Sequence, residues 1–216
     1  MSKECLKVTM SIFRNAQVKF RFAYSKVEEL QSFFESQKVG MAFIGRSNVG
    51  KSSLINALFG KGIARTSKTP GRTQQVIVFE VFLENGKSFH LFDLPGYGYA
   101  KVSREQKKEW KKLMATFFSL IPEEVLLLCI QDSRHPFQAA DLDFFHFLEE
   151  YDLNSFLLFN KIDKLKTQKD RAQLKKIKSQ RFDKEDLSMV FDVSAEKRTG
   201  LNELERSLIN FVYSCL

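Results

Sequence analysis

The 216 residues, 44% of them hydrophobic, suffice for one globular domain with a sizeable core and are few for two. The three cysteines lie far apart, the N-terminus lacks the apolar core of a signal peptide, and no apolar run approaches the roughly 20 residues of a membrane span, so we expect a cytoplasmic protein that makes no membrane contact. The net charge of +8 is concentrated in residues 101–112 and 164–181, which together carry +11 and leave about −3 for the remainder.

The N-terminal residues 1–38 differ in pattern from the rest of the chain. The segment Val18–Phe22 alternates side chains with the period of a strand, and Ser25–Leu30 is typical of a capped helical turn. We interpret residues 1–38 as an extension that packs on a domain formed by residues 39–216.

A glycine-rich stretch, Gly45–Ser53, follows the apolar run Met41–Ile44 and precedes the helix-like run Leu54–Phe59. The pattern G-x-x-x-x-G-K-[ST] between a strand and a helix indicates a phosphate-binding loop. Its backbone N–H groups and the positive end of the helix point at a phosphate. We expect Lys51 to reach the β- and γ-phosphates and the Ser52 hydroxyl to bind Mg²⁺. The alternative, a glycine turn that carries a lysine by chance, is disfavoured by the correct flanks.

Residues 60–74 are rich in Gly, Thr and Lys and lack apolar periodicity, so we expect a loop there. One threonine of this loop should bring a hydroxyl to Mg²⁺ and an N–H to the γ-phosphate. The candidates are Thr66, Thr69 and Thr73. The strands Gln75–Leu83 and Ser88–Phe92 follow, and the Asn-Gly turn between them predicts an antiparallel hairpin.

The second strand of this hairpin leads into Asp93-Leu-Pro-Gly96. An acidic residue at this point can bind Mg²⁺ through a water, and a glycine N–H can meet the γ-phosphate. An ordinary turn is the alternative. An amphipathic helix is predicted next, and it begins near Ser103 and Gln106, which form a capping pair.

Beyond this helix, strand-like and helix-like runs alternate to the C-terminus. The alternation predicts an α/β fold with a mainly parallel sheet of six strands, one antiparallel edge hairpin, and helices on both faces. Ligands of such folds bind at the carboxyl ends of the strands. The expected elements are strand Val125–Ile130, helix Leu142–Tyr151, strand Ser155–Phe159, helix Gln168–Arg181, strand Leu187–Val193 and helix Leu201–Val212.

Two motifs that follow strands suit a guanine base. In Asn160-Lys-Ile-Asp163, the Asn160 amide can pair with the O6/N7 edge, the Lys161 stem can cover the ring, and Asp163 can accept from N1–H and the 2-amino group. Adenine lacks this pair of donors, so a buried carboxylate there rejects ATP. In Ser194-Ala195, backbone N–H groups can reach the guanine O6. A polar loop without this function is the alternative for each motif taken alone.

Together these motifs resemble those of the EngB family of bacterial GTP-binding proteins. The resemblance runs from about residue 13 to the C-terminus and is weak over residues 17–38. It implies a P-loop GTPase domain in a monomeric, magnesium-dependent protein that assists assembly of the large ribosomal subunit and is needed for normal cell division and septation. The motifs that carry the resemblance are Gly45–Ser53, Thr69–Gln74, Asp93–Lys101, Asn160–Asp163 and Ser194-Ala195, with Asp132, Arg134, Pro136 and Asp141.

The resemblance also implies roles for individual residues. It selects Thr73 as the threonine that binds Mg²⁺ together with Ser52. With Lys51 and Gly96, the residues that the motifs place at the γ-phosphate, Thr73 completes the expected catalytic set. The residues that it implies contact GTP or GDP are Gly45, Arg46, Ser47, Asn48, Val49, Gly50, Lys51, Ser52, Gly71, Arg72, Thr73, Gln74, Gln75, Asp93, Leu94, Pro95, Gly96, Asn160, Lys161, Ile162, Asp163, Val193, Ser194 and Ala195.

The residue after Gly96 is Tyr97, where many GTPases carry a glutamine that orients the attacking water. We therefore expect slow hydrolysis by the isolated protein. Asn48 can compensate if, as in related GTPases, it binds a K⁺ beside the β- and γ-phosphates, where the ion neutralises developing charge. A purely structural role for Asn48, through hydrogen bonds within the loop, is the alternative.

The basic segments 101–112 and 164–181 are predicted to face RNA, with solvated helix faces as the alternative. Three functions are compatible with the motifs. The first is a GTP-driven factor for ribosome assembly, and the second is a scaffold that binds GTP without significant hydrolysis. The third is an ATP-using kinase or ATPase, against which Asn160 and Asp163 argue.

Overall fold

The computed structural model describes residues 12–36, 38–65, 75–98, 103–183 and 185–216. The strands are β1 (Gln17–Tyr24), β2 (Gly40–Gly45), β3 (Val76–Phe82), β4 (Ser88–Asp93), β5 (Val125–Asp132), β6 (Ser155–Asn160) and β7 (Val190–Asp192). The helices are α1 (Ile12–Asn15), α2 (Val27–Phe33), α3 (Lys51–Phe59), α4 (Arg104–Leu120), α5 (Ala139–Leu148), α6 (Gln168–Arg181) and α7 (Leu201–Cys215), with 3₁₀ turns η1 (Ile162–Lys164) and η2 (Asp186–Met189).

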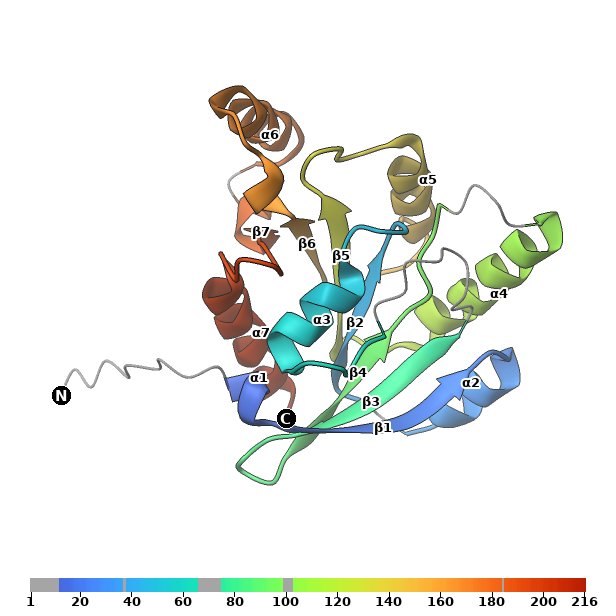
Figure 1. Ribbon diagram of the computed structural model, residues 1–216. Coiled ribbons are helices and arrows are strands. Elements are labelled where there is room, and N and C mark those ends of the chain that lie inside the picture. The colour runs from blue at the N-terminus through green and yellow to red at the C-terminus, as the bar shows by residue number, and fades with distance from the viewer. Residues whose placement is uncertain (1–11, 37, 66–74, 99–102, 184) are drawn as a thin grey trace.

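All seven strands form one sheet in the order β1-β3-β4-β2-β5-β6-β7 (Figure 1). The strands β4, β2, β5, β6 and β7 are parallel, whereas β3 is antiparallel to both β4 and β1. The predicted mainly parallel sheet and its antiparallel hairpin are thus confirmed. The expected count of six strands is corrected to seven, because β1, from the N-terminal residues, pairs with β3 and forms the edge of the same sheet.

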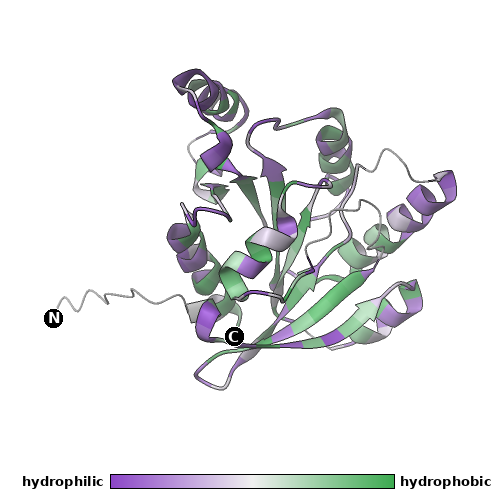
Figure 2. Cartoon of the chain, in the orientation of Figure 1, coloured by the Kyte–Doolittle hydropathy of each residue, from purple (hydrophilic) through white to green (hydrophobic). Residues whose placement is uncertain are grey.

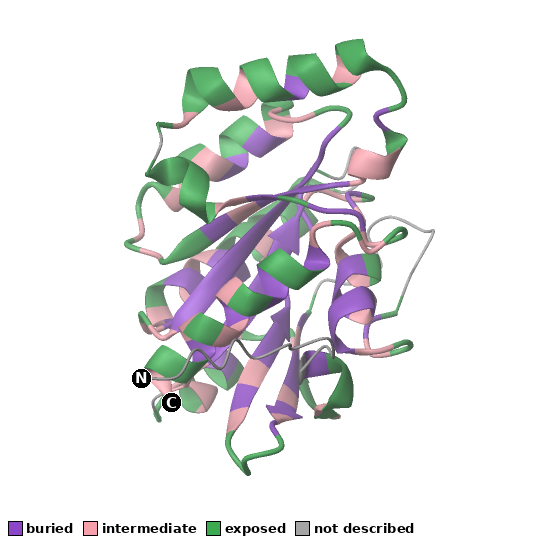
Figure 3. Ribbon diagram, turned by 90° about the vertical axis from the view of Figure 1, so that its left-hand side faces the viewer, coloured by how far each residue is buried: buried purple, intermediate pink, exposed green. Residues whose placement is uncertain are grey.

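Helices cover both faces of the sheet, as the alternation of elements predicts. On one face, α3 and α7 bury residues such as Leu54 and Leu204. On the other face, α2, α4 and α5 bury residues such as Met114 and Phe144. Figure 2 shows the central strands in hydrophobic colours, and Figure 3 shows them buried. Each fully buried side chain of this size contributes about 1.5–3 kcal/mol, so the two layers fix the positions of the loops at the sheet's edge.

Local signals in the sequence set most element boundaries. The Ser103 hydroxyl accepts from the Gln106 N–H at 3.1 Å, which confirms the capping pair at the start of α4. The predicted strand Leu187–Val193 is shorter than expected, because Asp186–Met189 forms the turn η2 and only Val190–Asp192 pairs with β6.

No helix of the described residues is long and apolar enough to cross a membrane. The five parallel strands direct their carboxyl ends to one edge of the sheet, where the loops after β2, β4, β5, β6 and β7 meet. The predicted motifs Gly45–Ser53, Asp93–Gly96, Asn160–Asp163 and Ser194-Ala195 lie in these loops, whereas Thr69–Gln74 lies outside the described residues.

Candidate functional site

The phosphate-binding loop connects β2 to α3, as its flanks predict. Gly45 ends the strand, and Lys51 and Ser52 begin the helix. Gly50 has φ 96°, and a Cβ there would lie 2.4 Å from the Asn160 amide nitrogen. This position therefore requires glycine both for its backbone conformation and for its contact with the loop after β6.

The predicted phosphate-side residues Lys51 and Asp93 are brought together. The Lys51 ammonium forms an ion pair with the Asp93 carboxylate at the end of β4. Asp93 is buried, so its charge is compensated mainly by this lysine. Ser52, the predicted magnesium ligand, follows Lys51 in the first turn of α3.

The segment Leu94–Tyr97 runs beside the phosphate-binding loop. The Leu94 N–H donates to the Phe43 carbonyl at 3.0 Å, and the Ser47 N–H donates to the Tyr97 carbonyl at 3.0 Å. The Tyr97 N–H reaches the Gly45 carbonyl at 3.4 Å. These bonds hold Pro95 and Gly96 beside the loop expected to bind phosphates.

Tyr97 is fixed inside the protein. Its hydroxyl donates to Asp141 Oδ1 at 3.1 Å, and its ring stacks on Phe144 with 4.2 Å between ring centroids. Burial, followed by the neighbouring Asp141 carboxylate, raises the pKa of Tyr97 far above its usual value. Asp141 also accepts from Arg46 at 3.4 Å and from the Gln138 N–H at 2.9 Å, where it caps α5. The sequence gives Asp141 only as part of the family pattern and does not indicate this contact with Tyr97.

Asn160 connects three loops and is almost fully buried. Its amide nitrogen donates to the Val49 carbonyl at 3.0 Å, and its amide oxygen accepts from the Lys161 N–H at 2.8 Å and the Ala195 N–H at 3.1 Å. We expected this amide to pair with the guanine edge, and the structure instead gives all three contacts to protein groups. Asn160 therefore holds the guanine-side loops against the phosphate-binding loop.

Lys161 is held at its end by the protein. Its ammonium donates to the Asn48 carbonyl and to Asp132 Oδ2, the latter at 2.9 Å. Arg134 also binds Asp132. Burial alone would raise the pKa of Asp132, but the hydrogen bonds from Arg134 and Lys161 outweigh it and hold that pKa well below its usual range. The charged Asp132 thus anchors the Lys161 ammonium at the candidate site.

Asp163 is the middle residue of the turn η1 and faces the loop after β7. Its carboxylate accepts from the Ser194 hydroxyl at 2.6 Å and pairs with Lys164 at 3.2 Å. Burial alone would raise the pKa of Asp163, but the hydrogen bonds from Ser194 and Lys164 lower it, so the group is charged at neutral pH. An ionised carboxylate in this position is an acceptor for two N–H donors.

The backbone of Ser194-Ala195 differs from expectation. The Ser194 N–H donates to the Thr199 carbonyl at 2.9 Å, and the Ala195 N–H donates to Asn160. Both groups that we expected to face the guanine O6 are thus used within the protein. Val193 and Ile162 join the two loops through an N–H to carbonyl bond of 3.3 Å.

The remaining predicted residues lie on or beyond the border of the described chain. Gln75 directly precedes β3, whereas Gly71, Arg72, Thr73 and Gln74 lie outside the described residues, as do Thr66 and Thr69. Across the described ranges, no group of three or more His, Cys, Asp or Glu side chains could hold a metal ion. The chemistry of Ser52 and Asp93 fits a hard cation such as Mg²⁺ when phosphate oxygens supply further ligands.

Three comparisons with known proteins agree with this geometry. Residues 40–161 match the family model described as 50S ribosome-binding GTPase. The chain is 39% identical to the probable GTP-binding protein EngB of Mycoplasmopsis synoviae, over 88% of this chain and 97% of that protein. It is also 39% identical to the protein of the same name from Fusobacterium nucleatum, over 88% and 96%.

Solved structures share the fold. A crystal structure of a probable GTP-binding protein engB matches with a TM-score of 0.61 and 25% identity, over 82% of this chain and 100% of that one. Aquifex aeolicus Era bound to GDP and AlF₄⁻ matches with a TM-score of 0.65 and 22% identity, over 82% and 57%. The second likeness shows the fold alone.

Proposed function

The chain belongs to the EngB family of GTP-binding proteins, and we propose that it is a magnesium-dependent GTPase with slow intrinsic hydrolysis that assists assembly of the large ribosomal subunit. The observation that carries this proposal is the position of Asp163. Its charged carboxylate lies beside Ser194, in loops that Asn160 ties to the phosphate-binding loop. A fixed anion there pairs with the two N–H donors of guanine and is left unpaired by adenine.

At the phosphate end, Lys51 binds the β- and γ-phosphates in place of its present partner Asp93. Ser52 and Thr73 bind Mg²⁺, which supplies charge neutralisation at the phosphoryl group that is transferred. The Gly96 N–H meets the γ-phosphate. Tyr97 takes no part in orienting water, because its side chain is bonded to Asp141 and stacked on Phe144. The intrinsic rate is slow for this reason.

The proposed partner is a precursor of the large ribosomal subunit, which the protein meets as a cytoplasmic monomer. The description of the matching family model supports this partner. Era, a structural neighbour at 23% identity, has been crystallised with MgGDPNP and a segment of 16S ribosomal RNA, which supports RNA as the contacted component. The resemblance to the EngB family further implies that the protein is needed for normal cell division and septation.

The basic face of α4 supports an RNA contact. Lys107, Lys108, Lys111 and Lys112 are all exposed, and Figure 2 shows the beginning of α4 in hydrophilic colours. Lysines in such a cluster neutralise phosphates of the RNA backbone, and the counterions that were condensed on the RNA are released on binding.

The test is GTP turnover at saturating GTP, with and without large ribosomal subunits. We expect the particles to raise turnover on the order of tenfold or more, because the missing water-orienting group must come from a partner. Changing Lys107, Lys108, Lys111 and Lys112 to Glu should abolish the stimulation and leave unstimulated turnover unchanged. A control with the same change in net charge replaces the exposed Lys19, Lys26, Lys61 and Lys87 with Glu.

The alternative function is a scaffold that binds GTP without significant hydrolysis of its own. It predicts nucleotide-dependent binding to the particles with no stimulation of turnover. Equal turnover with and without particles, together with retained binding, would establish the scaffold and overturn the assembly GTPase.

A further inference from the structure

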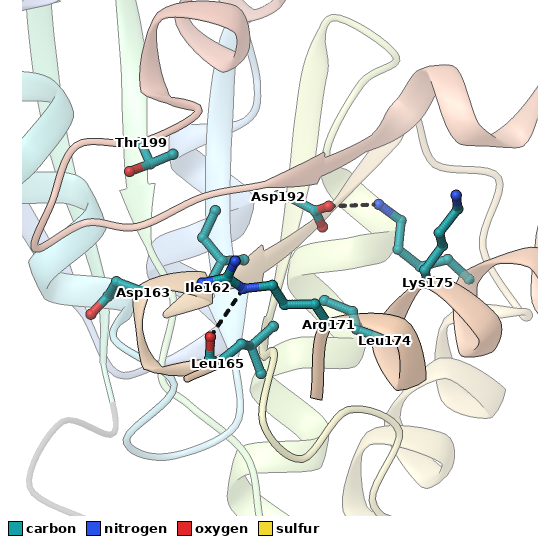
Figure 4. Close-up of a pocket in the computed structure, with 9 residues that line it drawn as sticks. Ile162, Asp163, Leu165, Arg171, Leu174, Lys175, Asp192 and Thr199 are labelled. Carbon is teal, nitrogen blue, oxygen red and sulfur yellow. Dashed lines mark hydrogen bonds and ion pairs between the residues drawn. The ribbon is translucent and has the colours of Figure 1, made fainter. Parts of the chain in front are cut away.

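A cavity of about 630 Å³ lies beneath α6, between this helix, the turn η1 and β7 (Figure 4). Its apolar lining comes from Ile162, Leu165 and Leu174. Figure 4 shows Arg171 reaching toward Leu165, the residue after η1, and its Nε donates to the Leu165 carbonyl at 3.2 Å. The volume is in the range of sites that bind small molecules.

The composition of α6 explains why this space is left open. Six of its fourteen residues are basic and one is acidic, and Leu174 is its only fully buried side chain. The helix therefore docks on the sheet through few apolar contacts, unlike α3 and α7. A helix held this way leaves room beneath it that apolar side chains would otherwise fill.

The charged groups around the cavity are unequally compensated. Lys178 pairs with Asp192 at 3.0 Å, and Asp163 is compensated by Ser194 and Lys164. Lys175 has no ion-pair partner in the described part of the chain. The cavity therefore combines an apolar floor with a positive rim formed by Arg171 and Lys175.

We propose that this cavity binds one unpaired nucleotide of an RNA partner, with the base on Ile162, Leu165 and Leu174 and the phosphate at Lys175 and Arg171. This inference rests on the proposed function, since it specifies which form of RNA the protein contacts. A splayed-out base supplies the apolar plane and its phosphate supplies the anion, which together complement the two halves of the cavity. A base within a duplex is stacked and cannot enter.

The cavity shares a wall with the guanine site. Asp163 and Thr199 both line it. The Thr199 carbonyl accepts from the Ser194 N–H, and the Ser194 hydroxyl donates to Asp163. A nucleotide in the cavity therefore packs against the loops that hold guanine, and it slows release of GDP. By linkage, GDP or GTP strengthens RNA binding by the same factor.

The test compares two neighbouring lysines of α6 on GDP-saturated protein. Lys175 lines the cavity, whereas Lys176 does not, and both are exposed, so neither substitution threatens the fold. The probes are a fluorescent single-stranded oligouridylate of about ten nucleotides and an RNA duplex of the same length. We expect the single strand to bind more tightly than the duplex. Lys175→Glu should weaken single-strand binding roughly tenfold, and Lys176→Glu about twofold.

A second measurement is the release rate of fluorescent GDP with and without the oligouridylate. The RNA should slow release from the unchanged protein and from Lys176→Glu but leave release from Lys175→Glu unaffected. Equal effects of the two substitutions, or equal binding of duplex and single strand, would overturn the proposal. The helix α6 would then bind RNA only as a basic surface without a nucleotide site. If the two variants differ only in binding RNA-free ribosomal proteins, the occupant is a protein and the RNA proposal is overturned. If the unchanged protein binds no RNA and its turnover ignores ribosomal particles, the proposed function fails as well.

Discussion

The guanine end and the phosphate end of the candidate site are held in different ways. At the guanine end, Asn160 joins three loops, and Asp163 is fixed by Ser194 and Lys164. At the phosphate end, Lys51 is paired with Asp93, the group expected to serve Mg²⁺ through water. In the GTP site that we propose, the guanine end is thus held by contacts within the protein, whereas Lys51 and Asp93 would have to exchange partners to bind phosphates and Mg²⁺.

This difference indicates how binding free energy is used at each end. A preformed site loses little conformational entropy on binding, so the base contributes mainly affinity and selectivity. Separating a buried ion pair costs free energy that phosphate and Mg²⁺ together must offset. On the proposed function, the phosphate end is therefore the part of the site whose contacts would depend on which nucleotide is bound.

The largest effect is expected from a change at the guanine end. Asp163→Asn replaces an acceptor with an amide that meets the guanine N1–H with a donor of its own, so GTP affinity should fall on the order of a hundredfold or more. Xanthosine triphosphate should become the preferred ligand, because its 2-oxo group accepts from the new amide. Titrations with GTP and with xanthosine triphosphate measure this change in preference.

The matched control for this substitution is Asp192→Asn. Asp192 is a partly exposed carboxylate of β7 that pairs with Lys178, and its loss should leave GTP affinity within about twofold. Unchanged GTP affinity in Asp163→Asn would contradict the assignment of Asp163 to guanine. The comparison between a guanine end and a phosphate end would then fail as well.

The next effect concerns Asn48, which borders both ends. Its carbonyl accepts from Lys161, whereas its exposed side chain makes no hydrogen bond within the described residues. The side chain is thus available to a K⁺ beside the β- and γ-phosphates. We expect GTP turnover to be roughly tenfold faster in K⁺ than in Na⁺ at equal ionic strength, because the ion stabilises developing charge.

Asn48→Ala should remove the difference between the two salts, whereas Asn85→Ala, in the exposed hairpin turn, should keep it. Equal turnover in both salts, with and without ribosomal particles, would leave Asn48 a structural residue of the loop.

Much of the fold is predictable from this sequence because its signals are local. The phosphate-binding loop, the Asn-Gly hairpin and the capping pair of α4 each depend on residues a few positions apart. The seventh strand was not predicted as part of the sheet, since the pairing of β1 with β3 joins Gln17 to Phe82 across the chain. A short amphipathic segment does not reveal such a distant partner.

In the candidate site, too, local motifs are predictable from the sequence, whereas contacts between distant loops are not. The motifs place Lys51, Asp93, Asp163 and Ser194 near the carboxyl ends of the strands, but they do not predict the ion pair of Lys51 with Asp93 or the hydrogen bond of Ser194 to Asp163. The partners of Asn160 and of the Ala195 N–H could not be predicted, because each group can bond equally well to a base or to a neighbouring loop. Deciding between them requires the distance between the loops after β2, β6 and β7. The contact of Asp141 with Tyr97 could not be predicted for the same reason, because the two residues belong to separate elements.

The smallest effect on GTP hydrolysis is expected from substitution of Tyr97. This substitution tests whether Tyr97 has a structural role or takes part in hydrolysis. Tyr97 is 6% exposed, and its side chain contacts Asp141 and Phe144, so we expect that a glutamine placed there would not reach the γ-phosphate. Tyr97→Gln should therefore leave unstimulated turnover unchanged, although glutamine is the water-orienting residue of many GTPases.

The same position should matter for stability. Tyr97→Phe keeps the stacking on Phe144 and removes one hydrogen bond to Asp141, which still accepts from Arg46 and the Gln138 N–H. We expect a loss of about 1 kcal/mol in the free energy of unfolding, measured in urea, with GTP affinity unchanged. A substantial rise in turnover of Tyr97→Gln would instead place residue 97 at the reacting phosphate. The slow rate would then be due to the tyrosine alone, and the water-orienting group would not have to come from a partner.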